Sequence, residues 1–458
     1  MSIDGLGMWR EAIAITYHHS WSFVPPIWWG STITSSSRGI GASIQYLPSL
    51  LAFPWLSGHI PVGAGAQYDY RLFYGDVLYV VAGAPVWVII TSVTAYLVAL
   101  TSRALGASRT TMLWAVAFYG LGSPALAASR GDWPQPLVAL SWVGAVWACL
   151  RFKESNRARW LWICALSVVY GVLTRPLEGS MLLPAVLLLL WPRRPISVRP
   201  AVGQVGAWLM AVAVTLLLNW ARFGSPLNFG YLLGTPQASW TTPIWIGLPT
   251  ALLSPGRGVL WEFPALVLAV PGTMLLWKQG ARVAALVLSV LPATLFLESC
   301  LFTDWPGGWD WGFRFFQPAL PLVAILAGIG VSRLSKGATS LLPPLLLAGG
   351  VLWNVPVVAT DLLGGYGATY AVPAANYGLD AYPPIGAWRF LHHLLPDSGS
   401  DSAAVDIVWF RATRIAGWLA LIPFGVLMAS ALTLWGIALR AENGRPLGSS
   451  QAREMNTI

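Results

Sequence analysis

Eleven long runs of apolar residues constrain the fold of this chain more than any other feature of its sequence. A helix needs ~20 apolar residues to cross a bilayer, and it satisfies its own backbone hydrogen bonds. Because 56% of the residues are hydrophobic and only 10% are charged, the sequence predicts an all-α polytopic membrane protein with about eleven transmembrane helices and external interfacial helices and loops. The runs cover residues 77–101, 110–128, 136–151, 159–174, 179–192, 202–219, 258–277, 282–302, 314–332, 340–359 and 413–439.

The loops between these runs separate into two alternating sets by charge. One set carries 16 Lys and Arg residues against three acids, whereas the other holds the remaining 11 bases and 15 acids. Basic loops are typical of the cytoplasmic side of a membrane, so the net charge of +9 does not indicate nucleic acid. We therefore expect a cytoplasmic C-terminus and external segments at 129–135, 174–178, 220–257, 303–313 and 360–412.

The chain divides accordingly into regions that alternate across the membrane. They are an external or interfacial loop region at 1–76, a transmembrane core at 77–359, an external loop region at 360–412, a last transmembrane helix at 413–440 and a cytoplasmic tail at 441–458. With eleven spans and a cytoplasmic C-terminus, residues 1–76 are external. Either 43–58 is a twelfth span that places the N-terminus inside, or a further helix that precedes this sequence carries 1–76 across the membrane. Pro48 and Pro54 favour an interfacial helix at 43–58.

Arginines collect near the predicted outer boundary, where a lipid phosphate would lie. Arg257 lies between two glycines in "SPGRG", and Arg175 lies in the short turn "LTRPLEG". The guanidinium fork matches phosphate oxygens, and Arg314 and Arg222 are further candidates. The alternatives are a snorkelling side chain for Arg257 and an exposed ion pair between Arg175 and Glu178, which would contribute ~0–1 kcal/mol.

A tryptophan-rich stretch, "TDWPGGWDWGFRF", follows the run at 282–302. Carboxylates accept hydrogen bonds from sugar hydroxyls, and indole faces can stack on a sugar ring. The candidate residues are Asp304, Trp305, Trp309, Asp310 and Trp311, with Trp133 in "SRGDWPQP" and Glu178 as further candidates. An aromatic belt at the membrane surface is the alternative reading, although such a belt needs no aspartates.

Two aspartates are candidates for catalysis. Asp4 precedes a short amphipathic stretch, and a carboxylate near an acceptor hydroxyl can act as a general base. Asp132 lies just before the run at 136–151. Helix N-caps are the alternative for both residues.

Three fragments of the chain resemble a known enzyme family. They are "NWARFGSPLNFGY" (219–231), "LLSPGRGVLWEFP" (252–264) and "GGWDWGFRFFQPALPL" (307–322). In order and spacing they resemble the GT-C class of integral-membrane glycosyltransferases, in the branch of the protein mannosyltransferases and the aminoarabinose transferases of lipid A. This resemblance implies a catalytic aspartate in the first external loop, which Asp4 matches, and Asp132 is our candidate for the second acid. The family's first helix, which precedes that loop, has no counterpart in this sequence.

The resemblance further implies transfer of a hexose or pentose, with inversion, from a polyprenyl-phosphate donor to a glycan, lipid or protein acceptor. The transfer would occur on the external face of a bacterial or archaeal inner membrane, as a step of cell-envelope glycan biosynthesis. No metal-ligand cluster stands out in the sequence, so no cofactor is expected, although the acidic loops could hold a divalent cation. A lipid or glycolipid transporter and an inactive relative without the first helix are the alternatives. The sequence names neither the sugar nor the acceptor.

Overall fold

The computed structural model describes most of the chain up to Ala359. The described residues are 8, 11–12, 15–16, 19, 39–52, 77–129, 133–191, 199–229, 239–254, 258–302, 313–334 and 337–359. Within these ranges every regular element is a helix, in agreement with the predicted all-α fold. The predicted regions 360–412, 413–440 and 441–458 lie outside the described residues.

Five helical spans of the described residues, which start at Val86, Gln135, Arg199, Arg282 and Arg314, are long and apolar enough to cross a membrane by length and composition. The elements are α2 (Ile40–Ile44), α3 (Leu47–Ala52), α5 (Val77–Ala104), α6 (Arg109–Gly120), α7 (Ala125–Ala128), α8 (Gln135–Ser155), α9 (Arg159–Thr174), α10 (Pro176–Leu190), α11 (Arg199–Phe223), α12 (Ile244–Leu253), α13 (Val259–Glu262), η3 (Pro264–Leu268), α14 (Ala269–Lys278), α15 (Arg282–Leu301), η4 (Arg314–Ala319), α16 (Leu320–Val331), η5 (Gly337–Leu341) and α17 (Leu342–Ala359).

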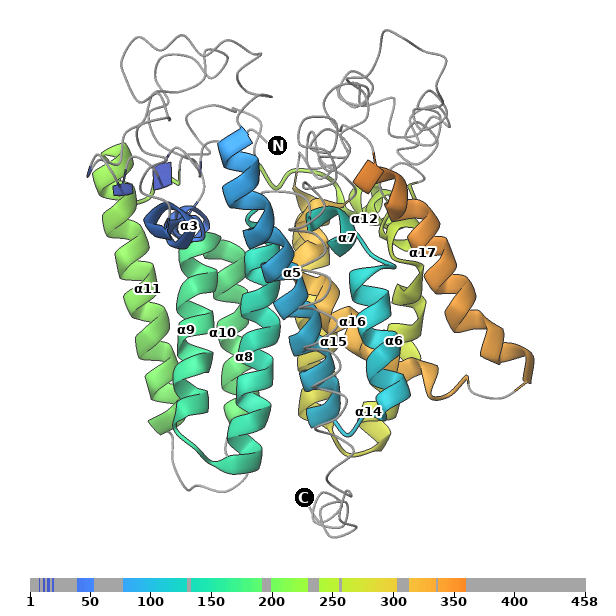
Figure 1. Cartoon of the computed structure of the whole chain (residues 1–458). Helices are drawn as coiled ribbons and strands as arrows, with labels where there is room; N and C mark the ends of the chain where they lie inside the picture. Colours follow the sequence, from blue (N-terminus) through green and yellow to red (C-terminus); the bar gives the residue numbers. More distant parts are fainter. Residues whose placement is uncertain are drawn as a thin grey trace, which may run out of the picture.

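The long helices run side by side along one direction, so the bundle has two ends (Figure 1). One end carries the α5–α6, α8–α9 and α14–α15 connections, and we call it the basic end. Its described basic residues include Arg103, Arg109, Arg151, Lys153, Arg157, Arg159, Lys278 and Arg282. The other end carries α2, α3, α7 and α12, and we call it the α12 end. Among the described residues, the connections of the basic set therefore lie at the opposite end from the α9–α10 turn and α12, which belong to the other predicted set (Figure 1).

Helix α16 forms the centre of the bundle. It is apolar all round, and 83% of the span from Arg314 to Val331 is buried, as expected for a helix without a polar face. Small residues allow its neighbours to approach closely, which is typical of helix contacts in membranes. A Cβ added at Gly330 would lie 2.2 Å from the Leu268 carbonyl oxygen, and one at Gly272 would lie 1.9 Å from that of Leu326.

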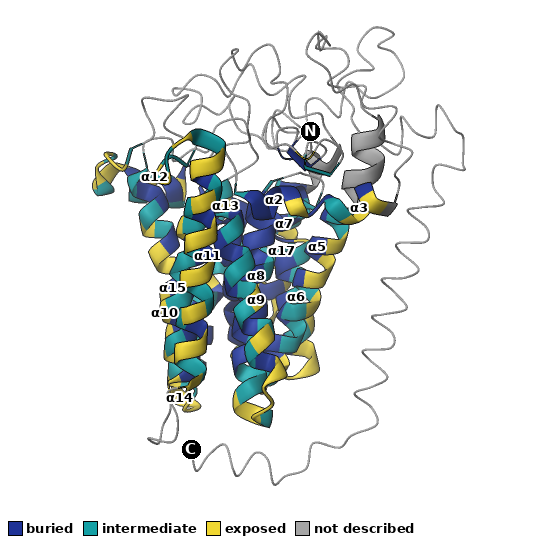
Figure 2. Ribbon diagram, turned by 90° about the vertical axis from the view of Figure 1, so that its left-hand side faces the viewer, coloured by how far each residue is buried: buried dark blue, intermediate teal, exposed yellow. Residues whose placement is uncertain are grey.

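Helix α11 lies at the periphery of the bundle. Only 17% of its span is buried, and its exposed face consists of large apolar side chains such as Leu209, Met210 and Leu217. Figure 2 shows this exposed face along α11, while the interior behind it is buried. A surface of this composition suits contact with lipid rather than with water.

The structure corrects several predicted elements. The segment 220–257, expected to be an external loop region, contains the helix α12, which packs on α15. The run at 258–277 is interrupted at Phe263, because a residue before proline is pushed out of the helical region. The run at 110–128 is interrupted between α6 and α7. In 43–58, the described residues form α2 and α3, each much too short to cross a bilayer.

The number of spans stays a prediction. Ten of the eleven predicted runs fall on described residues, and each of these is helical over at least part of its length. The run at 413–439 lies outside the described residues. Besides the five long helices, four shorter apolar helices occur at 159–174, 176–190, 244–253 and 264–278.

Candidate functional site

The turn between α9 and α10 places an arginine and a glutamate together at the α12 end. Arg175 is both the C-cap of α9 and the N-cap of α10. Its backbone is extended because Pro176 follows. Proline fits the first position of a helix, and Glu178 lies in the first turn, where a negative charge is favourable. The side chains of Arg175 and Glu178 form an ion pair with 12% and 7% exposure. The alternative reading of these two residues, an ion pair, is therefore present, but the pair is mostly buried rather than exposed, and the roles of Arg175 and Glu178 in binding a donor or acceptor stay predictions.

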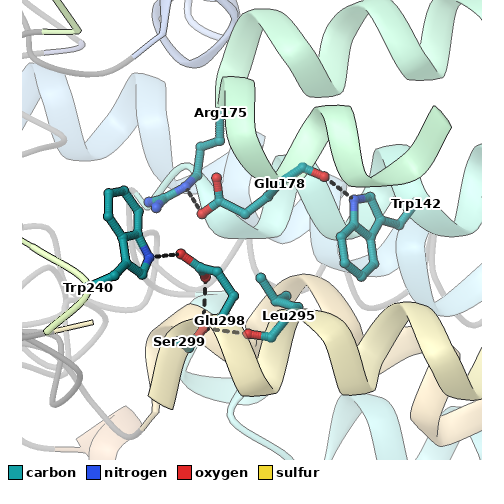
Figure 3. A network of polar contacts seen from close by, with 7 residues as sticks. All are labelled: Trp142, Arg175, Glu178, Trp240, Leu295, Glu298 and Ser299. Carbon is teal, nitrogen blue, oxygen red and sulfur yellow. Dashed lines mark hydrogen bonds and ion pairs between the residues drawn. The ribbon is translucent and has the colours of Figure 1, made fainter. Parts of the chain in front are cut away.

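A second carboxylate, Glu298 of α15, lies beside this pair. Figure 3 shows the Glu298 side chain directed toward Arg175 and Glu178, and its charge interacts electrostatically with both. The indole N–H of Trp240 donates to Glu298. The indole N–H of Trp142 donates to the Glu178 carbonyl oxygen at 3.0 Å. The network thus joins α8, α10 and α15 to the segment before α12.

Arg314 begins η4 and faces two aromatic rings. Its guanidinium carbon lies 5.1 Å from the ring centre of Trp133 and 5.1 Å from that of Phe315. The Arg175 guanidinium carbon lies 5.8 Å from the same Phe315 ring. Two arginines from distant parts of the sequence therefore converge on one phenylalanine at the α12 end. Such cation–π contacts hold a guanidinium without neutralising its charge.

A buried carboxylate fixes the backbone next to Arg314. The side chain of Glu262, which is 1% exposed, accepts the Phe313 backbone N–H at 2.8 Å and 3.1 Å. The Asn354 side-chain amide in turn donates to the Glu262 carbonyl oxygen at 2.8 Å. A hydrogen bond to a charged acceptor is worth ~1.5–3 kcal/mol. Glu262 therefore ties η4 to α13 and α17 and positions Arg314.

Arg222, at the end of α11, forms a buried ion pair with the N-terminal segment. Its Nη2 lies 2.6 Å from Glu11 Oε1, and the two side chains are 2% and 0% exposed. The Ser43 hydroxyl of α2 donates to the other Glu11 oxygen at 2.6 Å. Glu11 thus offsets the charge of Arg222 and links three separate segments.

Helix α2 lies directly against the end of α9. A Cβ on Gly39 would lie 2.1 Å from the Leu173 carbonyl oxygen, and one on Gly41 would lie 2.5 Å from the Thr174 hydroxyl oxygen. Only glycine permits this approach. The segment that contains Ser43 is therefore placed beside the residues that immediately precede Arg175.

The structure brings some predicted site residues together. Arg314 lies over the ring of Trp133, and Arg175 forms an ion pair with Glu178. Both guanidinium groups contact the ring of Phe315. Arg222 lies with Glu11 instead. The remaining predicted residues lie outside the described residues, and their roles stay predictions: Asp4, Asp132, Arg257, Asp304, Trp305, Trp309, Asp310 and Trp311.

Sequence reasoning did not select Glu298, Trp240 or Glu262 for the site. Glu262 and Glu298 are acids near the ends of apolar runs, and this position is the signal that points to them. In the described part of the chain, no group of three or more His, Cys, Asp or Glu side chains has the arrangement of a metal site. As described, the site offers two arginines that can attract an anion, two carboxylates that limit the net charge, and aromatic faces for an apolar or sugar surface.

Comparisons with known proteins give two structural similarities. No family model and no curated protein matches the chain. The crystal structure of ArnT from Cupriavidus metallidurans in the apo state has 13% identity and a TM-score of 0.47, over 86% of this chain and 71% of that one. The structure of ArnT from the same organism bound to undecaprenyl phosphate has 15% identity and a TM-score of 0.47, over 96% of this chain and 71% of that one.

Proposed function

We propose that this protein is a membrane glycosyltransferase that moves a sugar from a polyprenyl-phosphate donor to an acceptor at the α12 end of the bundle. The observation that carries the proposal is the convergence of Arg175 and Arg314 on Phe315, at 5.8 Å and 5.1 Å. The site lies at the end of apolar helices, where the phosphate of a lipid would meet the protein while its chain stays in the bilayer. The three family fragments of the sequence support the same assignment.

The two arginines act together in this proposal. Arg175, which is paired with Glu178, and Arg314, which lies over Trp133 and Phe315, both attract the donor phosphate. The leaving group is a lipid phosphate, whose negative charge grows as the bond from the anomeric carbon to the phosphate oxygen breaks. A fixed cation stabilises that charge in the transition state. Removal of either arginine therefore lowers the rate of transfer.

The remaining steps follow from the family resemblance. The acceptor hydroxyl attacks the anomeric carbon in one displacement with inversion, and Asp4 accepts its proton, with Asp132 as the second acid. The α12 end faces the outside of the cell membrane, because the basic loops lie at the other end.

The experiment is a transfer assay with matched arginine variants. Purified protein in nanodiscs is mixed with undecaprenyl phosphate carrying a radiolabelled hexose or pentose and with lipid, glycan and protein fractions of the cell envelope as acceptors. Arg314→Ala lowers transfer about 10²–10³-fold, whereas Arg282→Ala retains it. Arg282 is a suitable control because it also lies over an indole ring, that of Trp277 at 5.9 Å, but at the basic end.

Two results would overturn the proposal. One is full transfer activity in Arg314→Ala. The other is movement of the lipid head group between the leaflets of a proteoliposome without a new glycosidic bond, which would identify a transporter. Arg314→Lys refines the assignment, since lysine keeps the charge but lacks the planar fork that pairs with two phosphate oxygens.

A further inference from the structure

Two buried glutamines near Arg314 have side-chain carbonyl oxygens that accept no hydrogen bond from the described part of the chain. Gln135 and Gln317 are 1% and 3% exposed. Among the buried polar atoms of the described residues, their Oε1 atoms are without a donor, and neither residue has any other side-chain interaction. Buried amides in proteins are almost always hydrogen-bonded, and an unsatisfied one costs stability. This cost indicates that the two amides have a partner that is not part of the chain.

The two glutamines belong to elements that contact each other around Arg314. Gln317 follows Arg314 by three residues in η4, and residues three apart lie above one another in a 3₁₀-helix. Gln135 is the first residue of α8 and follows Trp133, the residue on which the Arg314 guanidinium lies. Helix α8 packs against η4. Both amides are thus within one helical turn of the contact between Arg314 and Trp133.

Two other buried side-chain amides serve as a comparison, because hydrogen bonds to the backbone hold them in place. Gln204 of α11 and Asn354 of α17 also have a carbonyl oxygen without a donor. Each, however, is fixed by its own N–H groups: Gln204 donates to the Leu161 carbonyl oxygen at 3.0 Å, and Asn354 donates to two carbonyl oxygens at 2.8 Å. Gln135 and Gln317 have no such attachment, so a purely structural role does not account for them.

We propose that Gln135 and Gln317 bind the hydroxyl groups of the sugar whose phosphate lies at Arg314, a subsite that rests on the proposed function. A sugar hydroxyl both donates and accepts a hydrogen bond, and a primary amide offers an acceptor oxygen and two N–H donors. The subsite therefore selects a neutral, hydroxyl-rich sugar ring, and it rejects a ring that leaves the buried amides unpaired.

The test compares two lipids that differ only in the sugar. Binding of undecaprenyl phosphate is measured with and without a linked glucose, galactose or mannose. Gln135→Met and Gln317→Met preserve the side-chain length and remove the amide. Each variant should bind the hexose-bearing lipid that the native protein prefers roughly tenfold more weakly than the native protein does. Each should bind the sugar-free lipid with the native affinity. Without ligand, each should be at least as stable as the native protein. Gln204→Met, at the other end of the bundle, leaves the ratio of the two affinities unchanged.

The outcomes separate the subsite from the function. An equal loss of affinity for both lipids overturns the subsite, because the amides then act on the phosphate or on the fold. Thermal unfolding at a lower temperature without ligand also overturns it, since the amides then hold the structure, for instance through bound water. If both variants keep the native ratio of affinities for the two lipids, the subsite is refuted. Sugar transfer by the native protein would still support the proposed function in that case. A native protein that neither binds nor transfers any of the sugars refutes both.

Discussion

Breaking the buried Glu11–Arg222 pair should cost a large part of the stability of the bundle. The two side chains are 0% and 2% exposed, so water cannot replace a lost partner. In Glu11→Gln the Ser43 hydroxyl keeps an acceptor, but the Arg222 guanidinium stays buried without its counter-charge. Removing one member of a buried pair costs ~3–5 kcal/mol, and we expect the lower part of this range because the amide still accepts a hydrogen bond.

The double variant tests the physical reason for this cost. Glu11→Gln combined with Arg222→Gln removes both charges, so a large share of the loss should return. We expect a coupling energy of ~2–3 kcal/mol, within the range for residues in direct contact. A suitable control is Arg151→Gln, which breaks the pair of Arg151 with Glu154. Those side chains are 35% and 52% exposed, so this loss should stay within ~0–1 kcal/mol.

The measurement is unfolding in mixed detergent micelles as the fraction of denaturing detergent rises, followed by the fluorescence of the 27 tryptophans. The reasoning is refuted if Glu11→Gln loses no more stability than the Arg151→Gln control. It is also refuted if the two single losses simply add in the double variant, because the charges would then not depend on each other.

Three further perturbations test individual contacts. Gly330→Ala should destabilise the protein by several kcal/mol in the same unfolding assay, since the added Cβ would lie 2.2 Å from a backbone oxygen. The control Gly206→Ala lies in open space and should be neutral or slightly stabilising. Equal effects of the two substitutions would contradict the close contact at α16. Glu262→Ala should cost ~1–3 kcal/mol and lower the transfer rate, because a buried N–H beside η4 loses its acceptor; an unchanged rate would separate this carboxylate from the site. Trp240→Phe should remove the hydrogen bond to Glu298 and speed hydrogen exchange in α12, and unchanged exchange would contradict that attachment.

The positions of the apolar runs were predictable because continuous hydrophobicity is a local property of the sequence. The predicted run at 159–174 coincides with α9, and the run at 282–302 differs from α15 by one residue. The interruption at Phe263 was also present in the sequence, as a proline at the next position, but hydropathy alone passed over it. Helix α12, which packs against α15, was missed because it is only ten residues long, too short for a membrane span.

The site was less predictable, because its residues meet only through tertiary contacts. The Arg175–Glu178 pair is local and was foreseen, but its burial was not, since burial depends on Phe315 and α15. Nothing local indicates that Arg222 pairs with Glu11 rather than with a phosphate. The unpaired state of Gln135 and Gln317 is likewise visible only once α8 and η4 are packed together.

The contacts of Glu262 set the order in which the site can form during synthesis. Its carboxylate accepts a hydrogen bond from the Phe313 backbone N–H, and its carbonyl oxygen accepts one from the Asn354 side-chain amide. The ribosome adds Asn354 about 90 residues after Glu262. At 5–20 residues per second, this interval lasts roughly 5–20 s. The contact that holds Glu262 to α17 can therefore form only after α17 has been synthesised. A nascent chain that is stalled before α17 would present its helices without a finished site.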